Sequence, residues 1–339
     1  MVRIAENKAM DKKPRTFKTS AKATSLRIPG LVSRDGQPRY VRVQTVNGPN
    51  IRTSERIEVR PAAPAANRGE PIVFATQNVL CPTCKVNSNT PAFAKRWPLI
   101  MAQVKANPPD VVLLQEAWNT KGSTKDGMFA PFASALAKAG YALDRPLEPN
   151  ATSPVGNRIA FKASKYTHVK SGSFAIPGER LTASWVLLKS RKTGKAFYAV
   201  SAHISPYIPV TGKNSQTSSA EVINTRMDAL NKSRLPVLMG GDTNVSQNLA
   251  GTTNPHTVFI KRGWTDMASA PKPAMAAYGA YNGLRTTTTD PTWGRIDYLY
   301  TRNLGGPTGY RNIITVSKSR TTSRHGSDHN MIIAQTRLK

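Results

Sequence analysis

Short apolar runs that end in a polar residue constrain the fold of this chain more than any other feature of its sequence. The clearest run, 235–239, stops at two glycines and is followed by Asp242 and Asn244. An apolar run of this length bounded by glycine predicts a buried strand. If the strand alternation continues, both polar side chains point the same way. Taken alone, the segment fits an ordinary turn as well as part of an active site.

Apolar runs elsewhere in the chain also end in a carboxylate, an amide or an imidazole. Such residues are Asn78, Glu116 and His203 at predicted strand ends, Asp297 within a strand, and Asp328 and His329 just before the last strand. Each has an ordinary explanation as a cap, a turn or a buried polar group. Their recurrence on separate segments predicts one functional site assembled at the strand ends.

From Pro71 onward, predicted strands and helices are mixed along the chain. Helical spacing of apolar residues occurs in the segments 91–107, 129–139 and 215–231. Strands are predicted at 72–80, 110–116, 157–161, 166–171, 181–188, 195–204, 235–244, 295–300, 313–316 and 329–336. This mixture predicts an α/β domain over residues 71–339.

The chain before residue 71 contains strand-like segments only. Segments 24–31, 39–47 and 54–61 carry the patterns Leu-x-Ile-x-Gly-Leu, Tyr-x-x-Val-x-x-Val-Asn and Ser-x-x-Ile-x-Val-x-Pro. Their order resembles the later half of a fibronectin type III module. We therefore expect a small, partial all-β segment at 1–62 and a linker at 63–70.

The first strands of such a module have no counterpart in the sequence. We therefore expect the natural protein to start upstream of Met1 and to be extracellular. A protein that starts at Met1 would instead be cytoplasmic, because no secretory signal is visible there.

The 339 residues carry a net charge of +29, which is spread over both parts of the chain. A field of this sign attracts polyanions, so nucleic acid is the first expected partner and an anionic membrane surface the second. A generally basic, well-solvated surface is the alternative explanation. No apolar run approaches the roughly 20 residues of a transmembrane helix, so we expect no membrane-spanning segment.

The two cysteines, Cys81 and Cys84, are the only ones in the chain. A zinc site needs further ligands, and the five histidines are not suitably clustered in sequence. We expect either a local disulfide or two free thiols.

The motifs beyond residue 70 resemble those of the endonuclease/exonuclease/phosphatase superfamily, which includes pancreatic deoxyribonuclease. In family order they are Thr76-Gln-Asn-Val-Leu80, Val112-Leu-Leu-Gln-Glu116, Asn157-Arg-Ile-Ala-Phe161, Ser201-Ala-His203, Gly241-Asp-Thr-Asn244, Arg295-Ile-Asp297 and Ser327-Asp-His329. The resemblance implies a four-layer α/β sandwich, with two mainly antiparallel sheets face to face and helices outside. Thr243 departs from the family, which most often has an aromatic residue there, so its packing is expected to differ.

The resemblance implies phosphoester hydrolysis with a divalent metal. The implied ligands of Mg²⁺, or of Mn²⁺ or Ca²⁺ as alternatives, are Glu116 with Asn78 and Asp328 beside it. The implied catalytic residues are Asp242 for the attacking water, Asn244 next to it, His203 for the leaving oxygen, and His329 with Asp297 as its orienting carboxylate. Arg158 and Arg180 are weaker candidates for phosphate contacts, because a solvated arginine explains each equally well.

The positive charge favours one substrate class within this superfamily. We expect a nuclease that acts on DNA or RNA. The alternative enzyme is a secreted phospholipid phosphodiesterase of the sphingomyelinase type. A third hypothesis is an adhesion or binding protein that keeps an inactive hydrolase site. Against it stands the completeness of the motif residues.

Overall fold

The chain divides into two compact units, Met1–Arg68 and Gly69–Lys339. The boundary lies within the predicted linker. The computed structural model describes residues 2–5, 15–17, 39–47, 50–53, 57–59, 69–119, 127–147, 156–178, 181–206, 209–210, 213–246, 254–285, 295–317, 320–321 and 325–338.

The described backbone of the first unit forms one sheet. Its strands are β1 (Val2–Ala5), β2 (Arg15–Phe17), β3 (Arg39–Asn47), β4 (Asn50–Thr53) and β5 (Ile57–Val59). The order is β2-β1-β3-β4, and β5 also pairs with β3. The alternating segment 39–47 is therefore a strand, as predicted. The segment 24–31 lies outside the described residues, so the fibronectin type III resemblance stays a prediction.

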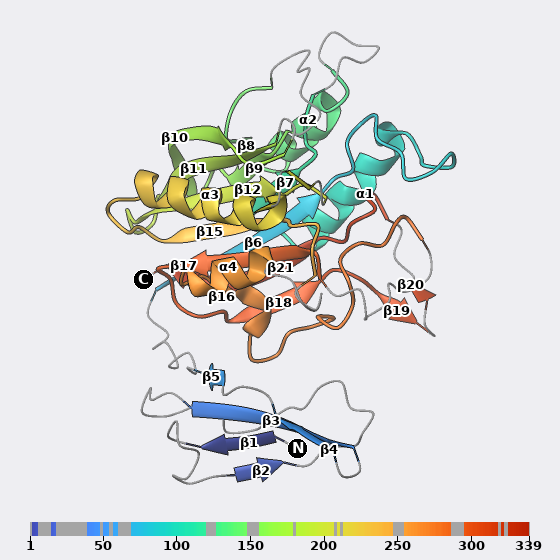
Figure 1. Cartoon of the computed structure of the whole chain (residues 1–339). Coiled ribbons are helices and arrows are strands. Elements are labelled where there is room, and N and C mark those ends of the chain that lie inside the picture. Colours follow the sequence, from blue (N-terminus) through green and yellow to red (C-terminus); the bar gives the residue numbers. More distant parts are fainter. Residues whose placement is uncertain are drawn as a thin grey trace. The chain divides into compact units, whose positions relative to one another are not determined.

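The second unit contains two six-stranded sheets (Figure 1). The first sheet has the order β18 (Gly309–Asn312), β21 (Ile332–Leu338), β6 (Glu70–Asn78), β7 (Val111–Gln115), β9 (Arg158–Lys162) and β8 (Tyr141–Leu143). The second has the order β10 (Tyr166–Ala175), β11 (Thr182–Ser190), β12 (Ala196–His203), β15 (Val237–Asp242), β17 (Asp297–Arg302) and β16 (Thr265–Asp266). Each sheet has one parallel pair, β6 with β7 and β12 with β15, and its other pairs are antiparallel.

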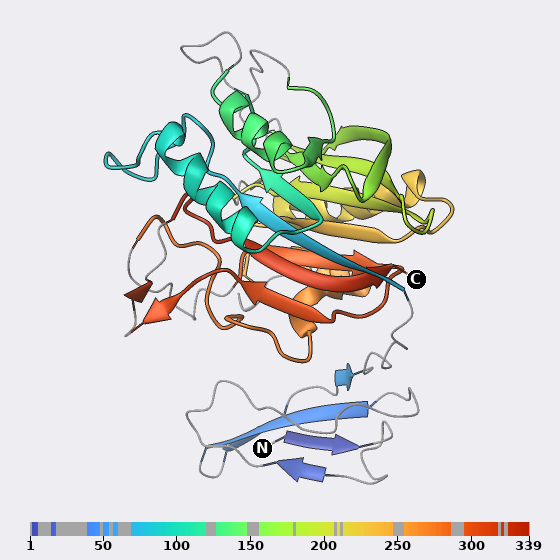
Figure 2. The same cartoon turned by 180° about the vertical axis from the view of Figure 1, so that it is seen from behind.

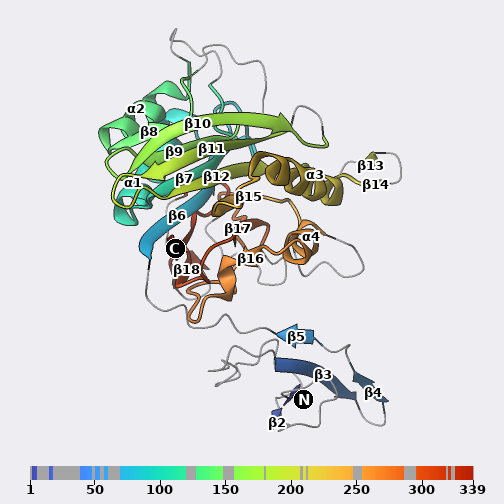
Figure 3. The same cartoon turned by 90° about the vertical axis from the view of Figure 1, so that its left-hand side faces the viewer.

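Four helices cover the outer faces of the two sheets. Helices α1 (Phe93–Ala106) and α2 (Ala130–Lys138) lie on the first sheet, and α3 (Ser215–Leu230) and α4 (Pro255–Lys261) lie on the second (Figures 2 and 3). Strand alternation divides β7 between two cores. Leu113 faces the core between the sheets, whereas Leu114 faces the core under α1 and α2. The predicted four-layer α/β sandwich is confirmed.

The helices predicted from apolar spacing are α1, α2 and α3. Helix α4 was not predicted, because its seven residues are too few to show a helical period. Its start is nevertheless capped, since the Asn254 side chain accepts a hydrogen bond of 2.9 Å from the Thr257 amide. The remaining short elements are β13 (Pro209–Val210), β14 (Lys213–Asn214), a 3₁₀ turn at Met267–Ser269, β19 (Val316–Ser317) and β20 (Arg320–Thr321).

The strand predicted at 313–316 is displaced in the structure. Strand β18 ends at Asn312, and Ile313 and Ile314 follow it as buried residues outside a strand. The apolar run therefore predicted correctly that this segment is buried, but it did not predict its backbone conformation. Within the described residues, no helix combines the length and apolar character needed to cross a membrane.

Candidate active site

The parallel strand pairs end at the same side of the two sheets, and their last residues form the candidate site. Strand β6 ends at Asn78 and β7 at Gln115, directly before Glu116. In the second sheet, Asp242 at the end of β15 is opposite His203 on one neighbour and Asp297 on the other. Strand ends that belong to distant parts of the chain thus deliver these side chains together.

A glycine lets β12 and β15 approach closely enough for this register. A Cβ atom on Gly241 would lie 1.8 Å from the carbonyl oxygen of Ala202 on β12. No side chain fits at that distance, so glycine is required next to Asp242. The glycine that ended the apolar run in the sequence is therefore part of what positions the site.

Asp242 lies at the centre of the site, between two histidines. Its Oδ2 is 3.5 Å from Nε2 of His203 and 3.6 Å from Nε2 of His329. The Asn78 side chain donates to the same oxygen at 3.2 Å. Asp242 is 2% exposed, so water reaches it only through the site. A buried carboxylate with one oxygen shared by two imidazoles and an amide is suited to hold a water and to take its proton.

His329 is paired with Asp297 on the side away from Asp242. Its Nδ1 lies 2.7 Å from Oδ2 of Asp297, which is fully buried. Burial alone would lower the pKa of His329, but the carboxylates of Asp297 and Asp242 outweigh it and raise the pKa well above its ordinary value. The carboxylates of Asp297 and Asp242 therefore favour the protonated form of His329, whose Nε2 side is directed at Asp242.

His203 is held by Asn244, which follows Asp242 by two residues. The Asn244 Nδ2 lies 3.1 Å from Nε2 of His203 and donates to the Ile204 carbonyl at 2.8 Å. The expected alternation of Asp242 and Asn244 is wrong in detail, because Asn244 has a φ of 54° and leaves the extended conformation. Asparagine tolerates this left-handed region, and the Asp242 carboxylate accepts the Asn244 amide at 2.8 Å. Both side chains still reach His203, through a turn.

Thr243 fills its position in a different way from the aromatic residue expected there. It is 5% exposed, and its hydroxyl donates to the carbonyls of Val245 and Ile296 at 3.1 and 3.0 Å. Its amide also donates to the Ile296 carbonyl at 2.8 Å. Thr243 thus ties the Asp242 turn to the residue before Asp297, which explains how the site tolerates the substitution.

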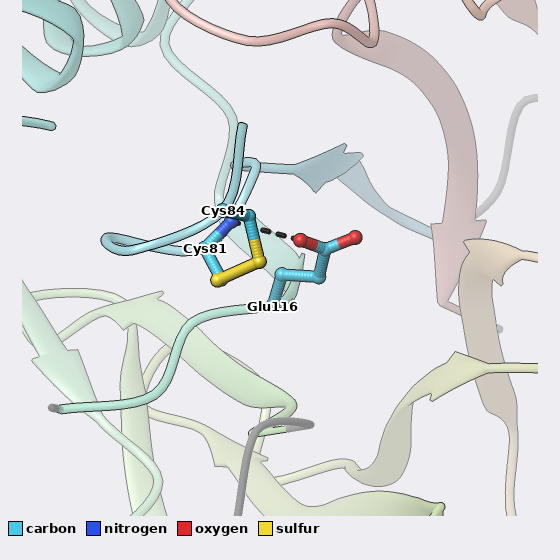
Figure 4. A group of neighbouring side chains, drawn as sticks. All are labelled: Cys81, Cys84 and Glu116. Atoms are coloured by element: carbon cyan, nitrogen blue, oxygen red, sulfur yellow. Dashed lines mark hydrogen bonds between the residues drawn. A yellow bond between two sulfur atoms is a disulfide. The ribbon is translucent and has the colours of Figure 1, made fainter. Parts of the chain in front are cut away.

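Glu116 and Asn78 form the other side of the site. The Asn78 Nδ2 donates to Oε1 of Glu116 at 2.9 Å, and the Cys81 amide donates to Oε2 at 2.8 Å (Figure 4). Asp328 is within electrostatic reach of both Glu116 and Asp242. Burial, the first cause, and these two carboxylates raise its pKa, although His329 opposes the rise. Of the three residues expected as metal ligands, Asn78 and Glu116 are therefore in direct contact, and Asp328 is near enough for its charge to interact with that of Glu116.

This collection of oxygen atoms suits a divalent cation. Besides burial, the carboxylates of Glu116 and Asp242 raise the pKa of Asp328, and a hard cation with oxygen ligands would relieve this repulsion between like charges. Asp242, Asp297 and His329 also have ligand atoms within 4.8 Å of one another and could hold a metal ion. Cys81 and Cys84 lie near Glu116, but their sulfur atoms form a disulfide and offer no thiolate. Of the two expectations for the cysteines, the disulfide is confirmed.

Arg158, a candidate for a phosphate contact, is bonded to the segment that follows Glu116. It is 3% exposed, and its guanidinium donates to the carbonyls of Ala117 and Pro146 at 2.9 and 3.2 Å. A contact of Arg158 with phosphate stays a prediction. Arg180, the other candidate, lies outside the described residues.

Asp297 does not pair with its neighbour Arg295, which was the ordinary explanation for that carboxylate. Arg295 instead makes a two-pronged contact with Asp266, at 3.1 and 2.6 Å. The Asp297 carboxylate pairs with His329 instead.

Two contributors to the site were missed from the sequence. One is the backbone amide of Cys81, which no residue type could reveal. The other is Arg96, which is buried behind the loop that carries that amide. The buried position of Arg96 could have been predicted from the sequence, because Arg96 falls on the apolar face of the predicted helix between Phe93 and Ile100.

Comparison with known families decides the class of the fold. The model of the Endonuclease/Exonuclease/phosphatase family matches residues 75–329, which is most of the chain. The chain belongs to this family. The match includes all the candidate site residues and none of the first unit. Members of the family are hydrolases of phosphoric esters and generally depend on divalent metals, and this chain is assigned to that class.

Solved structures agree on the fold at low sequence identity. An endonuclease/exonuclease/phosphatase family protein from Bacteroides thetaiotaomicron is 19% identical, with a TM-score of 0.63, and covers 80% of this chain and 99% of its own. The human Nocturnin catalytic domain is 16% identical, with a TM-score of 0.55, over 79% and 95%. TDP2 from D. rerio, complexed with a single-strand DNA product, is 14% identical, with a TM-score of 0.54, over 78% and 98%. No curated protein matches the chain.

Proposed function

We propose that this protein is a Mg²⁺-dependent nuclease that hydrolyses phosphodiester bonds of DNA or RNA. The observation that carries the choice of substrate is the net charge of +29 of a chain whose second unit has a site suited to phosphoester hydrolysis. A polyanion gains affinity from each phosphate that a basic surface neutralises, whereas a small phosphorylated metabolite gains little. TDP2, which shares the fold, is solved with a single-strand DNA product, in keeping with this choice.

The proposed cation site consists of Glu116, Asn78 and Asp328. A bound Mg²⁺ would polarise a phosphoryl oxygen of the substrate and offset the negative charge that develops on it. Glu116 is held for this purpose by two hydrogen bonds, from Asn78 and from the Cys81 amide. The side-chain oxygen of Asn78 accepts the Leu80 amide at 3.0 Å, while its Nδ2 faces Glu116 and Asp242, and these bonds fix the orientation of the side-chain amide.

The histidines and Asp242 supply the proton transfers. Asp242 takes a proton from the attacking water as the new P–O bond forms. His203 gives a proton to the leaving oxygen as the old P–O bond breaks, so the products are a phosphomonoester and an alcohol. His329, kept protonated by Asp297, donates from Nε2 to the phosphate and stays charged throughout. Asn244 keeps His203 in place beside Asp242.

A plasmid-nicking assay tests the proposal. The wild-type protein should nick plasmid DNA or cut a single-stranded RNA with Mg²⁺ and should be inactive with EDTA. Asp242→Ala should be inactive under both conditions. The nuclease assignment is wrong if the wild type cuts neither substrate, or if Asp242→Ala cuts as well as the wild type.

The same protein preparation separates the alternatives. Release of phosphocholine from sphingomyelin vesicles without nucleic-acid cleavage would support the phospholipid phosphodiesterase. Inactivity on all these substrates and on p-nitrophenyl phosphodiesters would support the binding protein with an inactive site. The bonded arrangement of Glu116, Asp242 and His329 argues against that last outcome.

A further inference from the structure

The loop after β6 is wrapped around a buried guanidinium. Arg96 on α1 is 1% exposed; its guanidinium donates to five backbone carbonyls, and its charge also interacts with those of Asp328 and Glu116. Its hydrogen bonds go to Pro91 at 2.9 Å, Val79 at 2.8 Å, Leu80 at 2.8 Å, Cys81 at 3.0 Å and Gly326 at 3.2 Å. Four of these carbonyls belong to the chain between β6 and α1, and the fifth precedes Asp328 by two residues. One side chain therefore fixes both segments that carry candidate metal ligands.

The Cys81–Cys84 disulfide closes the same loop from the other side. The two Cα atoms are 4.9 Å apart, and the Cys84 amide donates to the Cys81 carbonyl at 3.0 Å. The Cys81 carbonyl thus points at Arg96 and Cys84 while its amide points at Oε2 of Glu116 (Figure 4). A short covalent loop of this kind restricts the directions that the Cys81 amide can take.

Glu116 needs such restraint because its own backbone is unfavourable. Its φ of 55° lies in the left-handed region, which a residue with a side chain adopts only when its surroundings hold it there. The restraints are hydrogen bonds to both carboxylate oxygens, from Asn78 and Cys81. Without the Cys81 amide, one oxygen of Glu116 loses its donor and the carboxylate can turn away from Asp328.

We propose that Arg96 and the Cys81–Cys84 disulfide are positioning elements of the metal site. They hold the Cys81 amide against Glu116 and hold Glu116 beside Asp328, so that the two carboxylates meet one divalent cation. The inference rests on the proposed metal-binding role of Glu116 and Asp328. It adds that cation affinity depends on the oxidation state of the two cysteines. Reduction by a dithiol breaks the S–S bond, gives two thiols and converts the reductant to its own disulfide.

Mg²⁺ binding measured by calorimetry, without substrate, tests the inference. Groups that orient metal ligands typically contribute about 10- to 100-fold in affinity. Arg96→Met should raise the Mg²⁺ dissociation constant by about this factor. Dithiothreitol treatment of the wild type, with thiol counting to verify reduction, should raise it by about 10-fold. The double variant Cys81→Ala/Cys84→Ala should match the reduced wild type and should no longer respond to dithiothreitol.

Matched variants separate positioning from general damage. Lys105→Met removes an exposed positive charge from the same helix and should leave the Mg²⁺ constant unchanged. Arg96→Lys keeps the positive charge but loses the planar guanidinium with its several N–H donors. Its Mg²⁺ dissociation constant should therefore lie between those of the wild type and Arg96→Met. Circular dichroism and unfolding midpoints show whether each variant is folded. If Arg96→Met does not fold, reduced wild type decides the outcome.

Two negative results have different meanings. If Glu116→Gln binds Mg²⁺ as tightly as the wild type, the proposed metal site is wrong. If Glu116→Gln abolishes binding while the folded Arg96→Met variant, or the reduced wild type, keeps the wild-type constant, only the positioning inference is wrong.

Discussion

The candidate site has two halves that are held in place by different forces. In the oxygen half, Asn78, Glu116 and Asp328, the carboxylates accept hydrogen bonds from neutral donors: Asn78 and the Cys81 amide donate to Glu116, and the Ser327 hydroxyl donates to Asp328. The histidine half, His203, Asp242, Asn244, Asp297 and His329, is held by contacts between imidazoles and carboxylates. Asp328 and His329 are neighbours in sequence but serve different halves. The groups that transfer protons therefore lie in the histidine half. Binding of a cation and transfer of protons become separable functions.

Asp242→Asn should produce the largest loss. The amide keeps the shape of the side chain but cannot take a proton from water, and positioned proton transfer contributes roughly 10²–10⁴-fold to rate. The nicking rate at saturating Mg²⁺ should fall by about this factor, while calorimetric Mg²⁺ binding persists. Asp228→Asn, at a half-exposed carboxylate on α3 that pairs with Arg302, should be unaffected. Loss of Mg²⁺ binding in Asp242→Asn would break the separation into halves.

Glu116→Gln should act on the other half and should respond to metal concentration. Loss of the carboxylate weakens cation binding at least as much as the 10- to 100-fold effect typical of a group that only orients a ligand. Nicking at low Mg²⁺ should therefore fall by about 10- to 100-fold or more and recover partly as Mg²⁺ is raised. Asp242→Asn should show no such recovery. Identical Mg²⁺ dependence of the two variants would contradict the comparison.

The two halves also differ in how far the sequence could predict them. The strand-end residues were found because apolar runs mark buried strands, and the ends of neighbouring strands meet. Contacts such as His329 with Asp297 could be expected only through the family resemblance, since 32 residues separate the two in sequence. The four layers followed from the same resemblance together with the mixture of strand and helix periods.

The parts that could not be predicted are mainly backbone contacts. Nothing in the residue types shows that the Cys81 amide binds Glu116, or that Arg96 uses its donors on carbonyls. The contacts of Arg158 with the carbonyls of Ala117 and Pro146 were equally hidden, because an arginine that supports the backbone and one that binds phosphate have the same letter in a sequence. A turn at Asn244 was one of the two expectations for this segment, and it interrupts the expected alternation because alternation is a property of regular strands and ends where the strand ends.

Asp297→Asn should change the pH dependence of the histidine half. The Asp297 and Asp242 carboxylates raise the pKa of His329 against the effect of burial, so removing one of them should lower that pKa. Histidine NMR titration should show the His329 proton leaving at lower pH in the variant. Nicking should accordingly decline at lower pH than in the wild type, with Mg²⁺ affinity retained.

The pair of His329 and Asp297 also contributes to the stability of the folded protein. The raised pKa of His329 fixes the direction in which this contribution changes with pH. Since the folded pKa of His329 exceeds its unfolded value, the stabilisation is complete below the ordinary histidine pKa of about 6.5. This stabilisation is lost as the pH rises through the raised pKa of His329 in the folded protein. The difference in unfolding free energy between wild type and Asp297→Asn should therefore shrink as pH increases. A difference that is constant across this range would contradict the raised pKa.

Replacing Tyr281 should have the smallest effect of these substitutions, and the effect should be confined to substrate binding. Its side chain is 41% exposed, and its ring centroid lies 5.2 Å from that of His329 in an edge-on arrangement. The surrounding turn is fixed to the site, because the Asn282 amide donates to the Asp328 carbonyl at 2.6 Å. An exposed ring beside His329, the proposed phosphate contact, can stack on a nucleobase. Tyr281→Leu should raise KM for single-stranded DNA by about fivefold, the lower end of what base stacking contributes.

A substrate without the base identifies the cause of that effect. An oligonucleotide with one abasic linkage should be cut more slowly than its parent at that linkage by the wild type, but at the same rate by Tyr281→Leu. Removal of the ring and removal of the base are then not additive, which is what direct stacking requires. Additive losses would show that Tyr281 supports His329 instead. Its ring would then belong to the histidine half of the site and would have no direct role in substrate binding.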